Sequence, residues 1–542
     1  MRVERGHYEG ERSGASRRHE SGRPERVLTG AESLLLSLFA SGVDTCFANP
    51  GTSEMQFVDA LDRVPEMRGV LCLFEGVATG AADGYARMTG RPAATLLHLG
   101  PGLANGLANL HNARRAGSPI VNIVGDHATW HLEYDSPLTS DIEGFARPVS
   151  VFVRSARSVT EVGRDAAQAV AVARSARGVS TLIAPADISW SRGGIVAEPI
   201  PPTASPGIDG SRIDAAAAAL RAARRPAILL GSRLLRREPL EAAGRLAAAT
   251  GAQLYCDFFA PRLERGVGLV PVRRLPYLGQ QVMEELAGVD LLLLFEAQPP
   301  VSFFAYPGRP SELWPARARV MRVARRLDDG TAALEAVLET IRADNPPSRQ
   351  SPARPELPRG TLTVRSAGAV IAALLPENSI VVDESITSGV AVEPLCQGAA
   401  PHDWLSHTGG ALGLGWPMSV GAAIACPDRK TLCLLGDGSA MYTPQALWTH
   451  AREKLDVTTI VFSNRSYALL KQELTRIDAN PGPSALAVLS LEHPELRFAD
   501  LANAMGVEGC RVDTAESFAS ALKSALKTRG PRVIELTLAG GG

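Results

Sequence analysis

The sequence has 542 residues, 45% of them hydrophobic, and a formal net charge of −1 at pH 7. This length allows several domains of ordinary size, each with a buried core. The balanced charge excludes the electrostatic footprint of a nucleic-acid-binding protein, and the arginine-rich stretches lack the interleaved aromatic residues on which bases stack. We therefore expect a small-molecule ligand and no nucleic acid partner.

Three features of the chain bear on its location in the cell. The seven cysteines are scattered and form no Cys-x-x-Cys pair, which predicts reduced thiols in a cytoplasmic protein. Residues 1–27 are charged, glycine-rich and nearly free of aliphatic side chains, so we expect a disordered leader there. No stretch reaches about 18 uninterrupted apolar residues, and we expect no membrane span.

From residue 28 the chain alternates short aliphatic runs with alanine-rich helical stretches, which is typical of a parallel sheet wrapped by helices. The pattern occurs three times and predicts doubly wound parallel-sheet α/β domains over residues 28–197, 208–343 and 361–542. The intervening segments, residues 198–207 and 344–360, are rich in proline and poor in aliphatic residues, as interdomain linkers are.

An acidic turn follows one of the predicted strands in the third domain. Asp437 lies between two glycines after the apolar run 431–435. Thr443 and Pro444 are suited to open the next helix, and Asn464 ends the following predicted strand. A right-handed crossover makes the two strands parallel, so Asp437 and Asn464 are expected at the same sheet edge, where α/β sheets bind ligands.

The position of Asp437 suits a metal ion. At about 4 Å, a carboxylate facing a phosphate is repelled by about 4 kcal/mol at an effective dielectric constant of about 20. A divalent cation between the two groups reverses this sign. Mg²⁺ prefers oxygen ligands, and Asp437, Asn464, a carbonyl of the turn at 464–467, two phosphate oxygens and a water would complete its octahedron.

Two other interpretations of the turn remain open. A dinucleotide-binding fingerprint is disfavoured by Met441, which stands where the third glycine would be, and by the acid inside the loop. A tight turn without a ligand would also accept Gly-Asp-Gly, because glycine and aspartate are common turn residues.

The Gly-Asp-Gly turn at 436–438, followed by Asn464, resembles the signature of the thiamine diphosphate-dependent enzymes, the group of acetolactate synthase, benzoylformate decarboxylase and pyruvate decarboxylase. The resemblance covers nearly the whole chain from residue 28 onward. It implies a pyrimidine-binding, a middle and a pyrophosphate-binding domain. It also implies metal ligands and diphosphate contacts on the turn. The metal ligands would be Asp437, Asn464 and the carbonyl of Ser466, and the diphosphate contacts Gly438 and Ser439.

The same resemblance assigns residues to the rest of the cofactor. Glu75 opens a helix in the position of the family's activating glutamate, whose carboxyl binds the aminopyrimidine ring nitrogen and thereby promotes loss of the thiazolium C2 proton. Leu412 matches the apolar residue that wedges the two rings into a V, Gly410 would offer its carbonyl to the amino group, and Thr387 is the expected hydroxyl on the diphosphate. These residues would also suit ordinary capping and core packing.

Among members of this family, benzoylformate decarboxylase is the most similar in several short stretches. His98 falls at one of its two active-site histidines, and Thr52 falls where it has a serine near the substrate carboxylate. Its other histidine comes from the middle domain, but this chain has no histidine between His131 and His402. The missing proton donor favours transfer of the acyl group to another carbonyl over release of an aldehyde. His98 would also suit a purely structural imidazole, and His407 is a second candidate.

We therefore expect a thiamine diphosphate- and Mg²⁺-dependent enzyme acting on 2-oxo acids, an acetolactate synthase-like carboligase or decarboxylase. The alternatives are a benzoylformate decarboxylase-like or 2-hydroxyacyl-CoA lyase-like enzyme and a non-catalytic cofactor-binding scaffold. FAD is not expected, because the middle domain shows no glycine-rich phosphate loop after a strand. The resemblance implies a homodimer or homotetramer in which Glu75 of one chain and Asp437 of another share one cofactor.

Overall fold

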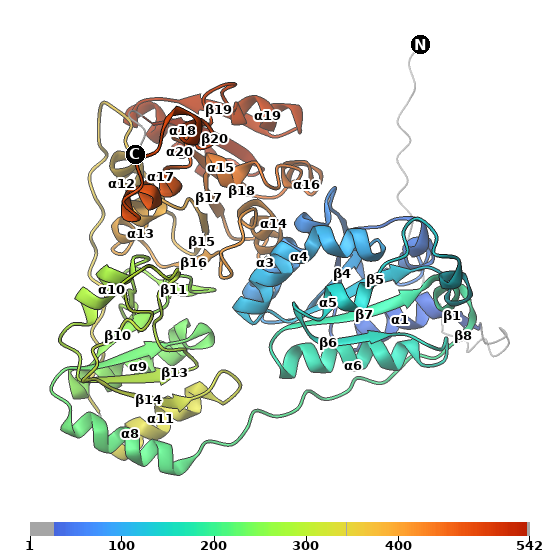
Figure 1. The fold of residues 1–542 in the computed structure, drawn as a ribbon, viewed down its shortest axis with the longest axis horizontal. Helices are drawn as coiled ribbons and strands as arrows, with labels where there is room; N and C mark the ends of the chain where they lie inside the picture. The colour runs from blue at the N-terminus through green and yellow to red at the C-terminus, as the bar shows by residue number, and fades with distance from the viewer. Residues whose placement is uncertain (1–26, 343, 539–542) are drawn as a thin grey trace, which may run out of the picture.

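The computed structural model describes residues 27–342 and 344–538, so the predicted leader lies outside the described residues except for Val27. Three sheets, mainly parallel and covered by helices, dominate this part of the chain (Figure 1). The predicted α/β fold class is confirmed. The segments at 198–207 and 344–360 contain no helix or strand, and the exact domain boundaries stay predictions.

Residues 45–185 of the described chain form the first sheet, whose parallel strands run in the order β3-β2-β4-β5-β7-β6. Helices α1, α2 and α6 pack over one core cluster and α3, α4 and α5 over another, because side chains alternate between the two faces of each strand. A short antiparallel pair, β1 with β8, joins the two ends of this region. The strands are β1 (Leu28–Thr29), β2 (Thr45–Asn49), β3 (Arg68–Leu71), β4 (Ala93–Leu97), β5 (Ile120–Asp126), β6 (Ser150–Ser155), β7 (Val179–Pro185) and β8 (Arg192–Gly194). The helices are α1 (Gly30–Ala40), η1 (Thr52–Glu54), α2 (Met55–Leu61), α3 (Glu75–Thr89), α4 (Leu99–Ala116), η2 (Thr129–Tyr134), α5 (Ile142–Ala146), α6 (Val162–Ser175) and α7 (Ala186–Trp190).

The second sheet is parallel throughout and runs in the order β12-β10-β9-β13-β14. Helices α8, α9 and α11 cover one face and α10 the other, each over its own core cluster. The strands are β9 (Pro226–Leu230), β10 (Gln253–Cys256), β12 (Arg273–Arg274), β13 (Leu291–Phe295) and β14 (Arg319–Ala324). The helices are α8 (Gly210–Ala222), η3 (Ser232–Leu235), α9 (Arg237–Thr250), α10 (Gly279–Leu286) and α11 (Gly330–Ile341).

The third sheet runs in the order β11-β16-β15-β17-β18-β20-β19. Its strands are parallel except β11, which comes from the predicted middle-domain range and pairs antiparallel with β16. The strands are β11 (Leu263–Arg265), β15 (Ser379–Glu384), β16 (His402–Ser406), β17 (Thr431–Gly436), β18 (Val457–Ser463), β19 (Glu508–Val512) and β20 (Arg532–Thr537). The helices are α12 (Val364–Leu374), α13 (Gly389–Leu395), α14 (Gly415–Ala425), α15 (Asp437–Ala440), α16 (Ala446–Arg452), α17 (Ala468–Arg476), α18 (Pro483–Ala487), α19 (Phe498–Ala504) and α20 (Ala515–Lys527).

The first and third sheets share one topology. Replacing β2 to β7 by β15 to β20 in the strand order of the first sheet gives the order of the third, apart from the added edge strand β11. The two sheets therefore present equivalent edges at the carboxyl ends of their strands, which is where open α/β sheets bind ligands. Helices α3 and α14, which follow equivalent strands, have equivalent positions.

Helices α3 and α14 pack directly on each other and join the first and third sheets (Figure 1). Residues of both helices, Ala81 and Met418 among them, belong to one hydrophobic core cluster. A Cβ on Gly84 would lie 2.2 Å from the carbonyl oxygen of Met418, and one on Gly421 would lie 1.8 Å from that of Ala81. Glycine is needed at both positions, because a side chain would force the helices apart.

Two further observations concern the described residues. The seven cysteines are free thiols, and all except Cys426 and Cys510 are buried. Among the described helices, none combines the length and the hydrophobicity that a membrane crossing requires.

The close contact of α3 and α14 generates a stability prediction. Gly84→Ala should destabilise the protein by about 1–3 kcal/mol, because the added methyl overlaps the backbone of α14. Differential scanning calorimetry should show a lowered thermal midpoint. Gly207→Ala is the control, because a Cβ on Gly207 meets nothing within 4 Å. Equal midpoints for the two variants would contradict the close helix contact.

Candidate functional site

Asp437 is the first residue of the short helix α15, directly after β17, and only 3% of it is exposed. Its Oδ1 accepts a hydrogen bond from the peptide N–H of Gly438 at 2.8 Å, and its Oδ2 accepts one from the peptide N–H of Arg465 at 2.5 Å. Burial raises the pKa of Asp437 to about 6, against the lowering effect of these peptide groups. A buried carboxylate held by peptide N–H groups alone is unfavourable, so a bound metal cation would stabilise it.

Two further oxygen donors lie in the turn after β18. Strands β17 and β18 are parallel neighbours in which Gly436 pairs with Phe462, so Asn464 lies at the same sheet edge as Asp437. Oδ1 of Asn464 accepts a hydrogen bond from the peptide N–H of Ser466 at 3.0 Å, whereas the carbonyl of Ser466 bonds to no group of the described chain. One carboxylate, one amide oxygen and one free carbonyl form a donor set that fits Mg²⁺.

The other residues predicted to contact a diphosphate lie around this turn. A Cβ on Gly438 would lie 2.6 Å from the ring of Tyr467, so only glycine lets this ring pack against the turn. Ser439 is buried in α15, and Thr387 is half-buried in the segment between β15 and α13. Because β15 is the neighbour of β17, Thr387 follows a strand that ends at the same edge as Asp437.

Residues 409–413, which we call the glycine loop, precede α14 and contain Gly410 and the half-buried Leu412. Gly410 has a φ of +75°, in the left-handed region that favours glycine. Oδ1 of Asn112 accepts the peptide N–H groups of Gly409 and Ala411 at 3.0 and 3.3 Å, and Nδ2 of Asn112 donates to the carbonyl of Ala411 at 2.9 Å. The peptide N–H and carbonyl of Gly410 bond to nothing in the described chain, so both are free for a ligand.

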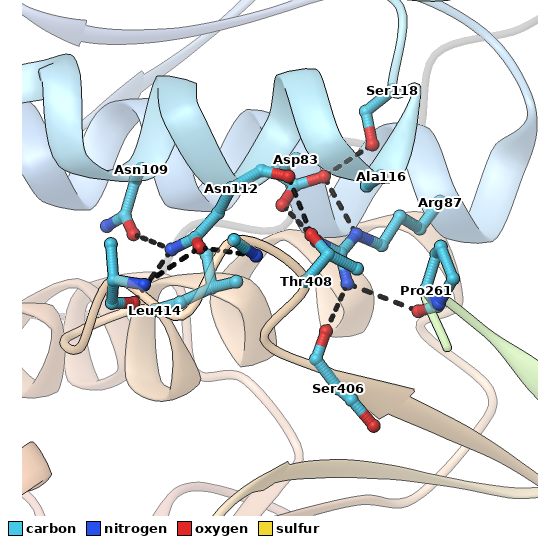
Figure 2. A network of polar contacts seen from close by, with 12 residues as sticks. Asp83, Arg87, Asn109, Asn112, Ala116, Ser118, Pro261, Ser406, Thr408 and Leu414 are labelled. Atoms are coloured by element: carbon cyan, nitrogen blue, oxygen red, sulfur yellow. Dashed lines mark hydrogen bonds and ion pairs between the residues drawn. The ribbon is translucent and has the colours of Figure 1, made fainter. Parts of the chain in front are cut away.

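Asn105, Asn109 and Asn112 form a stripe along one face of α4 at i, i+4, i+7 spacing, and Figure 2 shows Asn109 and Asn112. Nδ2 of Asn105 donates to Oε2 of Glu75 at 3.0 Å. Nδ2 of Asn109 donates to the carbonyl of Gly413 at 3.2 Å and to the carbonyl of Gly76, next to Glu75, at 2.8 Å. The stripe connects the carboxyl of Glu75 with the glycine loop. The spacing is visible in the sequence, but the stripe was not predicted from it.

A buried ion pair holds the segment before the glycine loop (Figure 2). Arg87 and Asp83, one turn apart on α3, pair through two contacts of 2.8 and 2.5 Å. Arg87 also donates to the carbonyl of Ser406 at 2.6 Å, the hydroxyl of Thr408 at 3.1 Å and the carbonyl of Pro261 at 3.2 Å. Breaking a buried ion pair would leave an uncompensated charge, which makes this network costly to disrupt. The network therefore fixes α3 against the segment after β10, at Pro261, and against the end of β16 and the residues after it, at Ser406 and Thr408.

Glu75 opens α3 and is 7% exposed. A Cβ on Gly102 would lie 3.1 Å from Oε1 of Glu75, so the start of α4 approaches the carboxyl closely. Asn105 binds the other carboxyl oxygen. The carboxyl group is thus buried and held in one orientation, as a group that exchanges a proton with a ligand must be.

His98 immediately precedes α4, and its ring is held by the turn at the start of η1. Its Nδ1 lies 2.8 Å from Oε2 of the buried Glu54, which also accepts the peptide N–H of Gly51 at 2.7 Å. A Cβ on Gly51 would lie 2.3 Å from the imidazole, so glycine is required there. Thr52, in the same turn, is exposed. Glu54 was not predicted, because nothing local in the sequence indicates that it bonds to a side chain after β4.

Two family models match the chain. The thiamine pyrophosphate enzyme N-terminal TPP-binding domain matches residues 28–145, and the C-terminal TPP-binding domain matches residues 388–536. These ranges contain Glu75 and Asp437, respectively.

Known proteins resemble the chain over nearly its full length. A putative acetolactate synthase large subunit, IlvX, from Mycobacterium tuberculosis is 50% identical over 94% of this chain and 99% of that protein. Benzoylformate decarboxylase from Pseudomonas aeruginosa is 29% identical over 91% of this chain and 96% of that protein.

A solved structure agrees with these sequence matches. The thiamine diphosphate-dependent 4-hydroxybenzoylformate decarboxylase of Rhodococcus jostii RHA1 superposes with a TM-score of 0.83 at 27% identity, covering 95% of this chain and 99% of that one. The sequence matches and the structural match therefore each cover more than 90% of the chain. The chain belongs to the thiamine diphosphate-dependent enzymes of the acetolactate synthase and benzoylformate decarboxylase group.

Proposed function

We propose that the chain requires thiamine diphosphate and Mg²⁺, removes CO₂ from a 2-oxo acid and transfers the remaining acyl group to a second carbonyl compound, as an acetolactate synthase-type carboligase. The 50% identical relative named a putative acetolactate synthase large subunit supports this reaction class. Thiamine diphosphate supplies, when bound, a sink for the electron pair that CO₂ leaves behind. FAD is not part of the proposal.

The buried carboxylate of Asp437 is the observation that carries this proposal. It lies at a sheet edge with the amide oxygen of Asn464 and the free carbonyl of Ser466, and these donors suit a cation that also binds a diphosphate. A turn without a ligand would gain nothing from burying an acid whose pKa is raised by that burial.

The other residues of the site would act on the cofactor as follows. Glu75, oriented by Asn105, would hold a proton at the pyrimidine ring nitrogen. The free carbonyl of Gly410 would accept a hydrogen bond from the amino group of the cofactor, and Leu412 would support the bent arrangement of its rings. The diphosphate contacts would be Thr387, Gly438 and Ser439.

A benzoylformate decarboxylase-like lyase is the second candidate, and the imidazole of His98 favours it. Glu54 holds Nδ1 of His98, while Nε2 bonds to no described residue and is available to a substrate. Thr52 lies in the same turn and would face the substrate carboxylate. The relatives named benzoylformate decarboxylase and 4-hydroxybenzoylformate decarboxylase support this candidate. Product analysis separates the two, since a lyase releases an aldehyde and a carboligase a 2-hydroxy ketone or acid.

The proposal includes a homodimer or homotetramer in the cytoplasm. Glu75 of one chain and Asp437 of another would then share one cofactor at the subunit interface. The seven free thiols support a reducing compartment. Analytical ultracentrifugation of the loaded protein tests the oligomer directly.

Asp437→Asn tests the metal site. The variant keeps the shape of the side chain but removes its charge, so the affinity for thiamine diphosphate in the presence of Mg²⁺ should fall by about 100-fold, or about 2.7 kcal/mol. Titration calorimetry of metal-free protein with cofactor, with and without Mg²⁺, measures this. Asp428→Asn, at an exposed aspartate of the same domain, should bind as the wild type does. An Asp437→Asn variant with unchanged affinity and unchanged Mg²⁺ dependence would remove the metal site from the proposal.

Glu75→Gln separates an enzyme from a cofactor-binding scaffold. The amide cannot exchange the proton, so turnover of 2-oxo acids should fall by about 10²- to 10⁴-fold. Cofactor affinity should change by less than about threefold, because the contact with α4 is retained. Glu66→Gln, at an exposed position, is the matched control. Unchanged turnover in the Glu75→Gln variant would exclude this carboxyl from the mechanism.

A further inference from the structure

Glu296 is a buried acid at the carboxyl end of β13 that takes no part in the proposed reaction. Only 8% of it is exposed, and it directly follows the apolar strand residues 291–295. Its φ is +53°, in the left-handed region where a residue with a Cβ is strained and glycine is favoured. The chain therefore places a carboxylate where the backbone conformation favours glycine, which indicates that the carboxylate is needed at this place.

Three strands of the second sheet end around this carboxylate. Strands β9 and β14 are the parallel neighbours of β13, so the residues after all three strands lie at one edge, where α/β sheets bind ligands. A Cβ on Gly231, directly after β9, would overlap the carbonyl oxygen of Glu296. A Cβ on Gly330, the first residue of α11, would lie 2.8 Å from Cγ of Glu296 and 2.9 Å from its Oε1. The two glycines thus leave room for Glu296.

The carboxylate of Glu296 is bound as an anionic ligand would be. Its Oε1 accepts the peptide N–H of Gly330 at 3.2 Å, at the N-terminus of the 12-residue helix α11. Oε1 also accepts a hydrogen bond from Nη2 of Arg233 at 2.8 Å, and Oε2 lies 3.2 Å from Nη1 of Arg177. Within the described part of the chain, neither arginine pairs with another carboxylate. Glycines, a helix N-terminus and guanidinium groups are the elements with which proteins bind phosphate.

The other charged groups at this edge do not replace Glu296. Asp328 is also buried, but its carboxylate accepts the peptide N–H of Arg325 at 2.8 Å. Burial lowers the pKa of Arg177, against the raising effect of Glu296. Burial and two arginines at the end of α4 likewise lower the pKa of Arg326. Removal of the Glu296 carboxylate would therefore leave uncompensated positive charge at this edge.

The same carboxylate joins two regions of the chain, because Arg177 lies between α6 and β7 of the first sheet. The guanidinium of Arg177 also donates to the carbonyl of Asp328 at 3.1 Å and to that of Arg326. The guanidinium of Arg326 donates in turn to the carbonyl of Arg177. Groups within the chain thus hold the carboxyl edge of the second sheet against the first region.

We propose that the carboxyl edge of the second sheet is a phosphate-type anion site that the chain fills with its own carboxylate, Glu296. The carboxylate takes the place that a phosphate group of a ligand would have, keeps such ligands out and joins the first and second sheets without one. The inference is independent of the proposed function, because it involves none of the residues assigned to the cofactor.

Glu296→Gly tests whether the carboxylate occupies the site. Glycine removes the side chain and adopts a φ of +53° without strain, so the site should open. Inorganic phosphate should then bind at one site per chain, at least about tenfold more tightly than to the wild type. Equilibrium dialysis with labelled phosphate measures this on protein supplied with thiamine diphosphate and Mg²⁺, which keep the acidic turn occupied. Equal phosphate binding by the variant and the wild type would overturn the proposal.

Two further variants separate occupancy of the site from its charge. Glu296→Gln removes the charge but keeps the volume, so its affinity for phosphate should exceed that of the wild type by no more than about threefold. Glu296→Asn has a shorter side chain that tolerates a positive φ, so it should bind phosphate more tightly than Glu296→Gln, even if Glu296→Gly does not fold. Equal affinities of these two variants would mean that the side chain does not fill the site, against the proposal.

Thermal stability provides a second readout. Because Arg177 and Arg233 lose their carboxylate, Glu296→Gly should have a lowered thermal midpoint, which phosphate restores in a saturable manner and chloride at equal ionic strength does not. Adding Arg177→Ala to Glu296→Gly should weaken phosphate binding at least about tenfold, which places the phosphate at this edge. Phosphate affinity unchanged by Arg177→Ala would contradict the assignment.

Glu393→Ala is the matched control. Glu393 is partly buried and pairs with Arg265 and Arg274, so its loss also leaves two arginines without a carboxylate. It lies inside α13 (Gly389–Leu395) rather than beside a helix N-terminus, so the variant should gain no saturable phosphate site. A phosphate site in Glu393→Ala as tight as that in Glu296→Gly would mean that unpaired arginines alone bind phosphate, and the proposal would fall.

Discussion

The acidic turn after β17 is the constraint on which the rest of the site depends. A carboxylate removed from water and bonded only to peptide N–H groups raises the free energy of the fold, and the raised pKa of Asp437 expresses this. A divalent cation bound between that carboxylate and a diphosphate would reverse the penalty, because it exchanges repulsion for attraction at short range. The oxygen donors of Asn464 and Ser466 lie in the turn after β18, which is next to Asp437 because β17 and β18 pair in parallel.

The second constraint is the contact between α3 and α14, the two helices that join the first and third sheets. Because α3 packs on α14 through glycines, the start of α3, which carries Glu75, is fixed relative to the glycine loop that precedes α14. The asparagine stripe on α4 makes this relation specific, since Asn105 binds the carboxyl of Glu75 and Asn112 binds the peptide groups on both sides of Gly410. If each cofactor lies between two chains, as proposed, one stripe touches the activating carboxyl of one site and the amino-binding loop of the other. A displacement of either end of the stripe would then affect both cofactor sites.

The sequence predicted those parts of the site that follow from local rules. Asp437 and Asn464 were placed at one edge because crossover handedness and strand direction follow from neighbouring segments, whereas Glu75 was assigned from the family resemblance. The pairing of His98 with Glu54 and the addition of β11 to the third sheet were not predicted. Both are contacts between segments far apart in the chain, and the hydrophobic pattern of a segment does not indicate which distant segment it contacts. The asparagine stripe was readable as a helical spacing, but polar residues at that spacing usually mark a solvated face. The packing of α4 against the glycine loop shows that these asparagines hold other segments rather than face solvent.

The absence of a histidine between His131 and His402 bears on the proposed reaction, because a proton donor would promote release of an aldehyde. Beside Gly410 the chain places the ring of Phe303, and the buried His407, whose pKa burial lowers to about 4, packs against the ring of Phe259. A phenyl ring supplies no proton, so in the proposed reaction it would favour transfer of the acyl group to a second carbonyl compound over release of an aldehyde. His98 would act against this, because its Nδ1 is held by the carboxylate of Glu54 while its Nε2 bonds to no described residue. In the proposed function, carboligation would therefore prevail where the reacting carbon lies beside Phe303 and out of reach of Nε2 of His98.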